Sequence, residues 1–93
     1  MGPRAQIPEF DWDDVNENHL WGRHKVSVWE AEQCFRDPNA SWRRIGDDMG
    51  MYASTDDRMG FLIYQQKRNG VVRIYGARNM TNNEKRKYRQ SRQ

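Results

Sequence analysis

The strongest constraint on the fold is a pair of alternating hydrophobic runs joined through an Asn-Gly dipeptide. Residues 61–66 and 71–77 alternate apolar and polar side chains, as β-strands with one buried face do. Asn69 and Gly70 lie between the runs, and Asn-Gly is the preferred centre of a type I′ turn because both positions need positive φ. The sequence therefore predicts an antiparallel hairpin in which Gln66 faces Arg73 and Tyr64 faces Tyr75.

This predicted register places the side chains of the hairpin on two different faces. We expect the helices to pack against the more hydrophobic face, which comprises Phe61, Ile63, Gln65, Val72, Ile74 and Gly76. The other face comprises Leu62, Tyr64, Gln66, Arg73, Tyr75 and Ala77. Its tyrosines could stack RNA bases while its arginine holds a phosphate. The alternative is that the tyrosines pack beneath another element.

Three helix starts carry the residues of reciprocal caps. The pairs are Asp14 with Glu17, Ser27 with Glu30, and Thr81 with Glu84. They predict helices over about residues 15–23, 28–35 and 82–89, and two further strands are predicted at residues 41–45 and 49–54. We expect an α+β fold with a small antiparallel sheet flanked by helices, forming one domain over residues 9–93 after a flexible leader at residues 1–8.

Composition and charge narrow the class of protein. The chain has 93 residues, of which 35% are hydrophobic and 12% aromatic, which fits one small folded domain with a thin core. The net charge of +3 is uneven, because residues 78–93 carry six basic side chains against one carboxylate. A basic end suits RNA or an acidic protein partner, although it is also compatible with a solvated helix. No apolar run approaches the roughly 20 residues of a membrane span or a secretory signal, so a cytoplasmic location is expected.

Three segments carry a distinctive set of residues. The first has Phe10-Asp11-Trp12-Asp13-Asp14, Asn16, His19-Leu20, Arg23-His24 and Val26; the second has Trp29-Glu30-Ala31-Glu32 and Phe35-Arg36-Asp37-Pro38; the third has Arg73-Ile74, Ala77-Arg78-Asn79-Met80-Thr81, Glu84, Arg86 and Tyr88. Together these segments resemble the BrnT family, the toxin half of bacterial BrnT/BrnA toxin–antitoxin pairs. The resemblance covers about residues 10–89. The chain departs from the family at Lys25, where a glycine is usual, at residues 55–59, where a Gly-Arg pair is expected before the strand, and at Gly76, where a serine or threonine is usual.

The resemblance implies a RelE-like fold and cleavage of RNA without a metal ion or other cofactor. It also implies a location in the bacterial cytoplasm and neutralisation by a BrnA-like antitoxin with a ribbon-helix-helix domain, which would bring operator DNA only indirectly. Two other functions stay open. One is a non-catalytic RNA- or protein-binding module on the same fold, and the other is a co-repressor within a DNA-binding complex.

RNA cleavage of this kind needs a group that moves protons and a group that binds phosphate. Histidine suits the first task near neutral pH and arginine suits the second. We therefore predict His24, Arg73 and Arg78 as catalytic residues. The predicted RNA-binding residues are Tyr64, Gln66, Tyr75, Lys85, Arg86 and Tyr88.

Each of these predictions has a structural alternative. In these alternatives His24 only ends a helix, Arg78 pairs with Glu84, and the tyrosines belong to the core. The only other histidine, His19, lies five residues before His24 and about 140° around a helix, so the two do not form a paired metal site.

Overall fold

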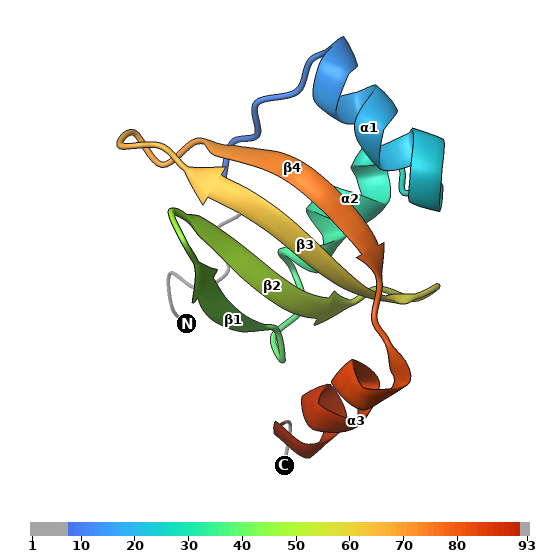
Figure 1. Ribbon diagram of the computed structural model, residues 1–93. Helices are drawn as coiled ribbons and strands as arrows, with labels where there is room; N and C mark the ends of the chain where they lie inside the picture. Colours follow the sequence, from blue (N-terminus) through green and yellow to red (C-terminus); the bar gives the residue numbers. More distant parts are fainter. Residues whose placement is uncertain (1–7, 92–93) are drawn as a thin grey trace.

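A four-stranded antiparallel sheet and three helices make up the fold (Figure 1). The computed structural model describes residues 8–91, so the predicted leader falls outside the described residues except for Pro8. In chain order the elements are α1 (Asp14–His24), α2 (Val28–Cys34), β1 (Ser41–Ile45), β2 (Asp48–Ser54), β3 (Met59–Gln66), β4 (Val72–Asn79) and α3 (Asn82–Ser91). The strands lie side by side in the order β1-β2-β3-β4, and the α+β prediction is confirmed. Within this described part, no helix is long and apolar enough to cross a membrane.

The helix caps follow the sequence closely, with one difference. Ser27 and Glu30 form the predicted capping box of α2, and Thr81 and Glu84 bond each other's backbone N–H at the start of α3. Helix α1 begins one residue early, because Asp13 is its N-cap and pairs with Asn16. The predicted cap at Asp14 is therefore wrong. Asn16, and not Glu17, is the partner of the N-cap residue. Asn16 is buried, and its amide also donates to the carbonyl oxygen of Ile74 at 3.3 Å, which connects α1 to β4.

The hairpin of β3 and β4 forms as predicted, but its register is shifted. Tyr64 faces Ile74, and Gln66 faces Val72. The reason lies in the turn, where Gly70 has φ of +88° but Asn69 does not have positive φ, so a type I′ turn is excluded. The Lys67 N–H instead bonds the Val71 carbonyl at 2.8 Å across a three-residue loop. A bulge then leaves Tyr75 between the pairs Tyr64–Ile74 and Ile63–Gly76.

The shifted register changes which side chains reach the core. Leu62, Tyr64, Val72 and Ile74 are all buried in one cluster with Leu20, Ala31 and Cys34 of the helices. The predicted faces of the hairpin are therefore partly wrong, because next to the turn β3 and β4 are shifted by one residue, so Val72 and Ile74 lie with Leu62 and Tyr64 on the helix side. Beyond the bulge the predicted register holds, with Ile63 opposite Gly76 and Phe61 opposite Arg78. In Figure 1 helix α2 passes behind the sheet and α1 lies beside β4, so neither covers the face toward the viewer.

The segment before α1 covers part of the β4 edge of the sheet. Phe10 forms a parallel bridge with Val72, and the Asp11 N–H bonds the Val72 carbonyl at 2.8 Å, so the segment before α1 covers part of the β4 edge. Trp12 fixes the same segment to α2 through a 2.7 Å hydrogen bond from its indole N–H to Glu32. These contacts give the aspartates before α1 fixed positions beside β4.

Candidate functional site

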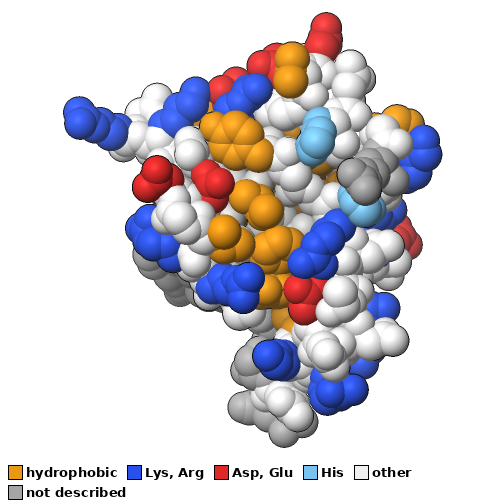
Figure 2. Space-filling view, viewed as in Figure 1, with side chains coloured by type: hydrophobic (Ala, Val, Ile, Leu, Met, Phe, Trp, Pro, Cys, Tyr) orange, Lys and Arg blue, Asp and Glu red, His pale blue; other side chains and the backbone are white. Residues whose placement is uncertain are grey.

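The sheet face left uncovered by α1 and α2, which we call the open face, combines aromatic, aliphatic and arginine side chains. By strand register it includes Arg43, Ile45, Asp48, Gly50, Tyr52, Phe61, Ile63, Gln65, Arg73 and Arg78, and the bulged Tyr75 lies beside Gln65 and Arg73. Figure 2 shows hydrophobic side chains gathered over the middle strands, with basic side chains and some acidic ones around them. Rings and guanidinium groups therefore share this surface.

The centre of the open face is a packed cluster around Gly50. The rings of Tyr52 and Phe61 have their centroids 4.7 Å apart. A Cβ at Gly50 would lie 2.8 Å from both Ile45 Cδ1 and Phe61 Cε1, so these side chains lie flat against the glycine backbone. The cluster gives the open face a rigid apolar floor.

The hairpin end of the open face holds Arg73 and Tyr75. The Arg73 guanidinium lies 3.4 Å from Asp11 and 3.0 Å from Asp13, so both its terminal nitrogens already face carboxylates. Tyr75 is 42% exposed and donates its hydroxyl proton to Gln65 at 3.1 Å. Tyr75 therefore offers an accessible ring, whereas Arg73 is engaged with the segment before α1.

The other end of the open face holds Arg78. Its two terminal nitrogens donate to the two carboxylate oxygens of Glu84 at 2.7 and 2.9 Å, and one of them also donates to the Asn79 carbonyl at 3.0 Å. The Arg78 hydrogen bond lowers the pKa of Glu84 to about 2. The central carbon of the guanidinium lies 4.6 Å from the centroid of the Phe61 ring. The sequence alternative, a pairing of Arg78 with Glu84, is thus observed.

His24 ends α1 at a corner organised by Arg58, a residue that the sequence reasoning did not propose for the site. The Arg58 guanidinium donates to the backbone carbonyls of His24 and Lys25 at 3.2 and 3.1 Å, and to the Asn79 side chain at 3.4 Å. It also pairs with Glu30 of α2 at 3.3 Å. Arg58 therefore joins the end of α1 to the end of β4, next to Arg78. The sequence signal that could have identified Arg58 is an arginine just before a strand. Its partners at the end of α1 and on α2 could not be identified in this way, because only the tertiary fold brings them together.

The predicted catalytic residues do not form a single cluster. Arg73 and Arg78 are five residues apart on β4, a separation of about 15 Å along a strand. One phosphate cannot contact both. The structure brings the exposed His24 to the corner where Arg78 lies and places Arg73 at the opposite end of the face. His19 is also exposed, rather than packed.

Two of the predicted RNA-binding tyrosines are in fact buried, so these predictions are wrong. Tyr64 is 6% exposed and packs edge-on against Phe35, with ring centroids 5.1 Å apart. Tyr88 is 2% exposed and donates its hydroxyl proton to Asp37, which anchors α3 to the sheet. The physical reason is that each ring fills an interface between elements.

The remaining predicted RNA contacts lie apart from the open face. Gln66 is exposed at the hairpin end, bonds the Gly70 carbonyl at 3.3 Å, and faces Val72 of the core side. Lys85 and Arg86 are on α3, which lies beyond the end of the sheet in Figure 1. Arg86 is exposed and Lys85 is half-buried, so α3 offers a separate basic surface.

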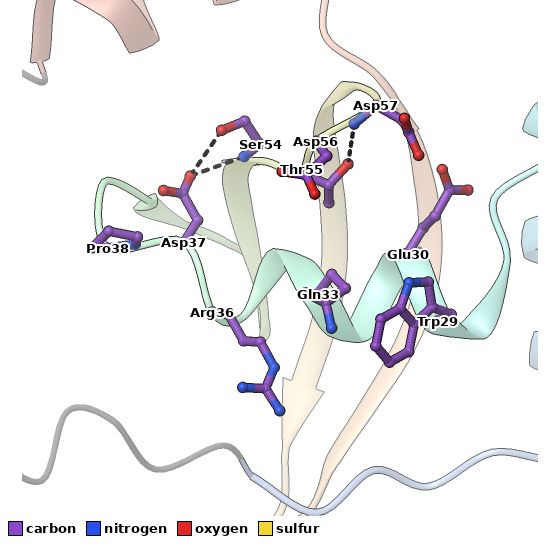
Figure 3. Close-up of a pocket in the computed structure, with 10 residues that line it drawn as sticks. All are labelled: Trp29, Glu30, Gln33, Arg36, Asp37, Pro38, Ser54, Thr55, Asp56 and Asp57. Atoms are coloured by element: carbon purple, nitrogen blue, oxygen red, sulfur yellow. Dashed lines mark hydrogen bonds between the residues drawn. The ribbon is translucent and has the colours of Figure 1, made fainter.

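A hollow of about 330 Å³ lies between α2 and the turn that joins β2 to β3 (Figure 3). Its lining includes four carboxylate residues, Glu30, Asp37, Asp56 and Asp57, against the single basic residue Arg36. Asp37 already accepts the Ser54 N–H at 2.9 Å, as Figure 3 shows. The negative lining disfavours a phosphate backbone, so the hollow is a poor RNA site despite the exposed Trp29 at its rim.

The reactive and metal-binding residue types add no second site. Within residues 8–91, no group of three or more His, Cys, Asp or Glu side chains is placed to hold a metal ion. Cys34 is buried, and burial raises the pKa of its thiol to about 12.

Neither a protein-family model nor a curated protein matches the sequence.

Proposed function

We propose that the protein binds single-stranded RNA on the open face and cleaves it without a metal ion, as the toxin of a BrnT-like toxin–antitoxin pair. The observation that carries the proposal is the open face itself, where the exposed ring of Tyr75 and the partly exposed ring of Tyr52 lie among arginines, over the buried Phe61. Aromatic rings and guanidinium planes stack bases of any sequence, while arginine charge attracts the backbone.

The backbone at Lys25 supports the BrnT resemblance independently of the open face. Lys25 is the αL residue that ends α1, with φ of +55°, and is the only non-glycine residue with positive φ among residues 8–91. The family usually has glycine there, and glycine is the residue that adopts this conformation most easily. The likeness extends the proposal to a RelE-like fold, since the chain runs from two helices through a four-stranded antiparallel sheet to a last helix.

The chemistry proposed for His24 is proton transfer. The 2′-oxygen of the RNA forms a bond to the adjacent phosphorus while the bond from phosphorus to the 5′-oxygen breaks, which leaves a 2′,3′-cyclic phosphate. The neutral imidazole of His24 accepts the 2′-hydroxyl proton, and a water molecule supplies the proton taken up by the leaving 5′-oxygen. His24 is exposed at the end of α1, and Arg58 links its backbone carbonyl to Asn79 at the end of β4. The backbone carbonyl of His24 is fixed by Arg58, which limits the freedom of the histidine.

The test is cleavage of single-stranded RNA in EDTA by the wild-type protein and two histidine variants. His24→Ala should lower the rate about 10²–10⁴-fold, the contribution typical of general acid–base catalysis. His19→Ala is the matched control, because His19 is exposed on the same helix, and it should leave the rate unchanged. Cleavage that disappears in EDTA and returns with Mg²⁺ would refute the metal-free mechanism, and equal rates for both variants would refute the role of His24.

A non-catalytic RNA-binding module is the second candidate, and the pairing of the two arginines favours it. Arg73 faces Asp11 and Asp13, and Arg78 faces Glu84, so neither offers a free fork of donors to a transition-state phosphate. RNA binding without detectable cleavage in the same assay would select this candidate.

The proposed partner is a BrnA-like antitoxin with a ribbon-helix-helix domain, and operator DNA would be reached only through it. The basic residues of α3, including Lys85 and Arg86, suit an acidic segment of such a partner, and we propose that the same partner also covers the open face around Tyr75. Titration of antitoxin into the cleavage assay should stop cleavage and displace RNA, with an effect that weakens as salt rises. Simultaneous binding of saturating RNA and antitoxin would contradict a shared surface.

A further inference from the structure

The hydrogen bonds of Arg78 leave little of its donor capacity for a ligand. A guanidinium has five N–H donors, and three of those on Arg78 are taken by the two oxygens of Glu84 and the carbonyl of Asn79. A phosphate bound in the fork of Arg78 would have to displace the Glu84 carboxylate. That carboxylate also accepts the Thr81 N–H at 2.9 Å, so its displacement would uncap α3 as well.

The position of Arg78 suits a different kind of contact. Its guanidinium lies over the Phe61 ring at 4.6 Å, and that ring in turn contacts Tyr52 with a centroid separation of 4.7 Å. Phe61 is buried, whereas the Arg78 side chain is 37% exposed. Arg78 therefore lies over the Phe61 ring, with three of its donors engaged by Glu84 and Asn79 and part of its side chain turned to solvent.

We propose that the guanidinium of Arg78 is a stacking platform for one nucleobase of the RNA, rather than a ligand for its phosphate. Glu84 and Phe61 hold the guanidinium in place, and a planar base covers its exposed side. Bases of single-stranded RNA stack on arginine planes as they do on aromatic rings. The proposal rests on RNA binding at the open face and adds which part of the RNA Arg78 contacts.

The experiment measures binding of a fluorescent, non-cleavable single-stranded RNA with 2′-O-methyl riboses, by anisotropy at several salt concentrations. Arg78→Lys keeps the charge but removes the planar group. It should weaken binding about 10-fold, within the range of one lost base stack, and leave the slope of log Kd against log salt unchanged. Arg44→Lys is the matched control, because Arg44 is exposed on β1 but its pairing with Met49 places it on the opposite side of the sheet, and it should bind like the wild type.

A second arm removes the base instead of the protein group. An abasic nucleotide moved along the RNA should weaken wild-type binding about 10-fold at one position and have no effect there with Arg78→Lys. Glu84→Gln, which frees the fork of Arg78, should not raise the salt slope. Thermal melting of each variant separates a loss of binding from a loss of fold.

The possible outcomes separate this inference from the proposed function. If Arg78→Lys binds like the wild type, or if Glu84→Gln raises the salt slope by about one, Arg78 contacts phosphate and the stacking inference is wrong. If the wild type binds no RNA, RNA binding and the stacking inference fail together. A base-dependent loss confined to Arg78→Lys supports both.

Discussion

At the scale of single residues, the least favourable backbone conformation occurs at Lys25. Its φ of +55° is a left-handed conformation that costs a residue with a Cβ about 1 kcal/mol relative to glycine. The position ends α1, where the Lys25 N–H bonds the Trp21 carbonyl at 3.0 Å, so the conformation is needed to turn the chain into α2.

We predict that Lys25→Gly unfolds with a free energy about 1 kcal/mol higher than Lys25→Ala. Both variants lose the contact of the lysine ammonium with the Trp21 ring at 5.4 Å, so their difference reports the backbone alone. Urea unfolding of the pair measures it. Equal stabilities would show that the left-handed conformation at residue 25 carries no strain.

Glu84 should make stability depend on acid pH. The Arg78 hydrogen bond lowers the pKa of Glu84 from 4.5 to about 2 in the folded state. Because the folded pKa is the lower one, the stabilisation is present above pH 4.5 and is lost as pH falls toward 2.

We predict that Glu84→Gln removes this part of the pH dependence. The difference in unfolding free energy between wild type and Glu84→Gln should be about 1 kcal/mol at pH 7, as for a partly exposed bidentate pair, and should shrink as the pH falls below 4.5. Glu9→Gln is the control, since Glu9 is exposed. A difference that stays constant down to pH 2 would contradict the role of the ion pair.

At the scale of secondary-structure elements, Gly50 tests how the open face is packed. A Cβ at Gly50 would meet Ile45 and Phe61 at 2.8 Å, whereas one at Gly76 on β4 would meet nothing within 4 Å. We predict that Gly50→Ala costs about 1–3 kcal/mol and that Gly76→Ala costs little. Thermal or urea unfolding of the two variants checks this, and equal costs would mean that the floor of the open face is loosely packed.

The elements themselves could be predicted from the sequence, and so could the hairpin register beyond the bulge, where Ile63 pairs with Gly76, but the register next to the turn could not. The caps at Ser27 and Thr81 and the strand at residues 41–45 are local signals, and each is confirmed. The Asn69-Gly70 signal indicated the hairpin correctly, yet the loop uses positive φ only at Gly70. The sequence pattern does not indicate the bulge at Tyr75 either, because the bulge accommodates the packing of Tyr64 and Ile74 in the core.

The candidate site could be predicted only in part, because the sequence does not show which side chains share a face of the sheet. Tyr75 and Arg78 were identified and lie on the open face, but so do Tyr52 and Phe61, which the sequence reasoning did not propose. Tyr64 and Tyr88 have the same chemistry in the sequence and are buried. Which tyrosines are accessible depends on register and helix docking, which are tertiary properties.

At the scale of the whole molecule, opposite surfaces differ in charge and in exposed aromatic residues. The open face offers Tyr75 among arginines, and the hollow beside α2 offers Trp29 among carboxylates. RNA carries a negative backbone and unstacked bases, so it needs both positive charge and rings on one surface. The open face combines arginine charge with the exposed ring of Tyr75, whereas carboxylates dominate the lining of the hollow.

The most direct test of RNA binding at the open face compares Tyr75→Ala with Trp29→Ala in anisotropy titrations of single-stranded RNA. Both residues are exposed, Tyr75 by 42% and Trp29 by 69%, so both substitutions should leave the fold intact. We predict that Tyr75→Ala weakens binding about 10-fold, as loss of a stacked base does, and that Trp29→Ala binds like the wild type. Weaker binding for Trp29→Ala with unchanged binding for Tyr75→Ala would place the RNA on the other surface and contradict the central claim.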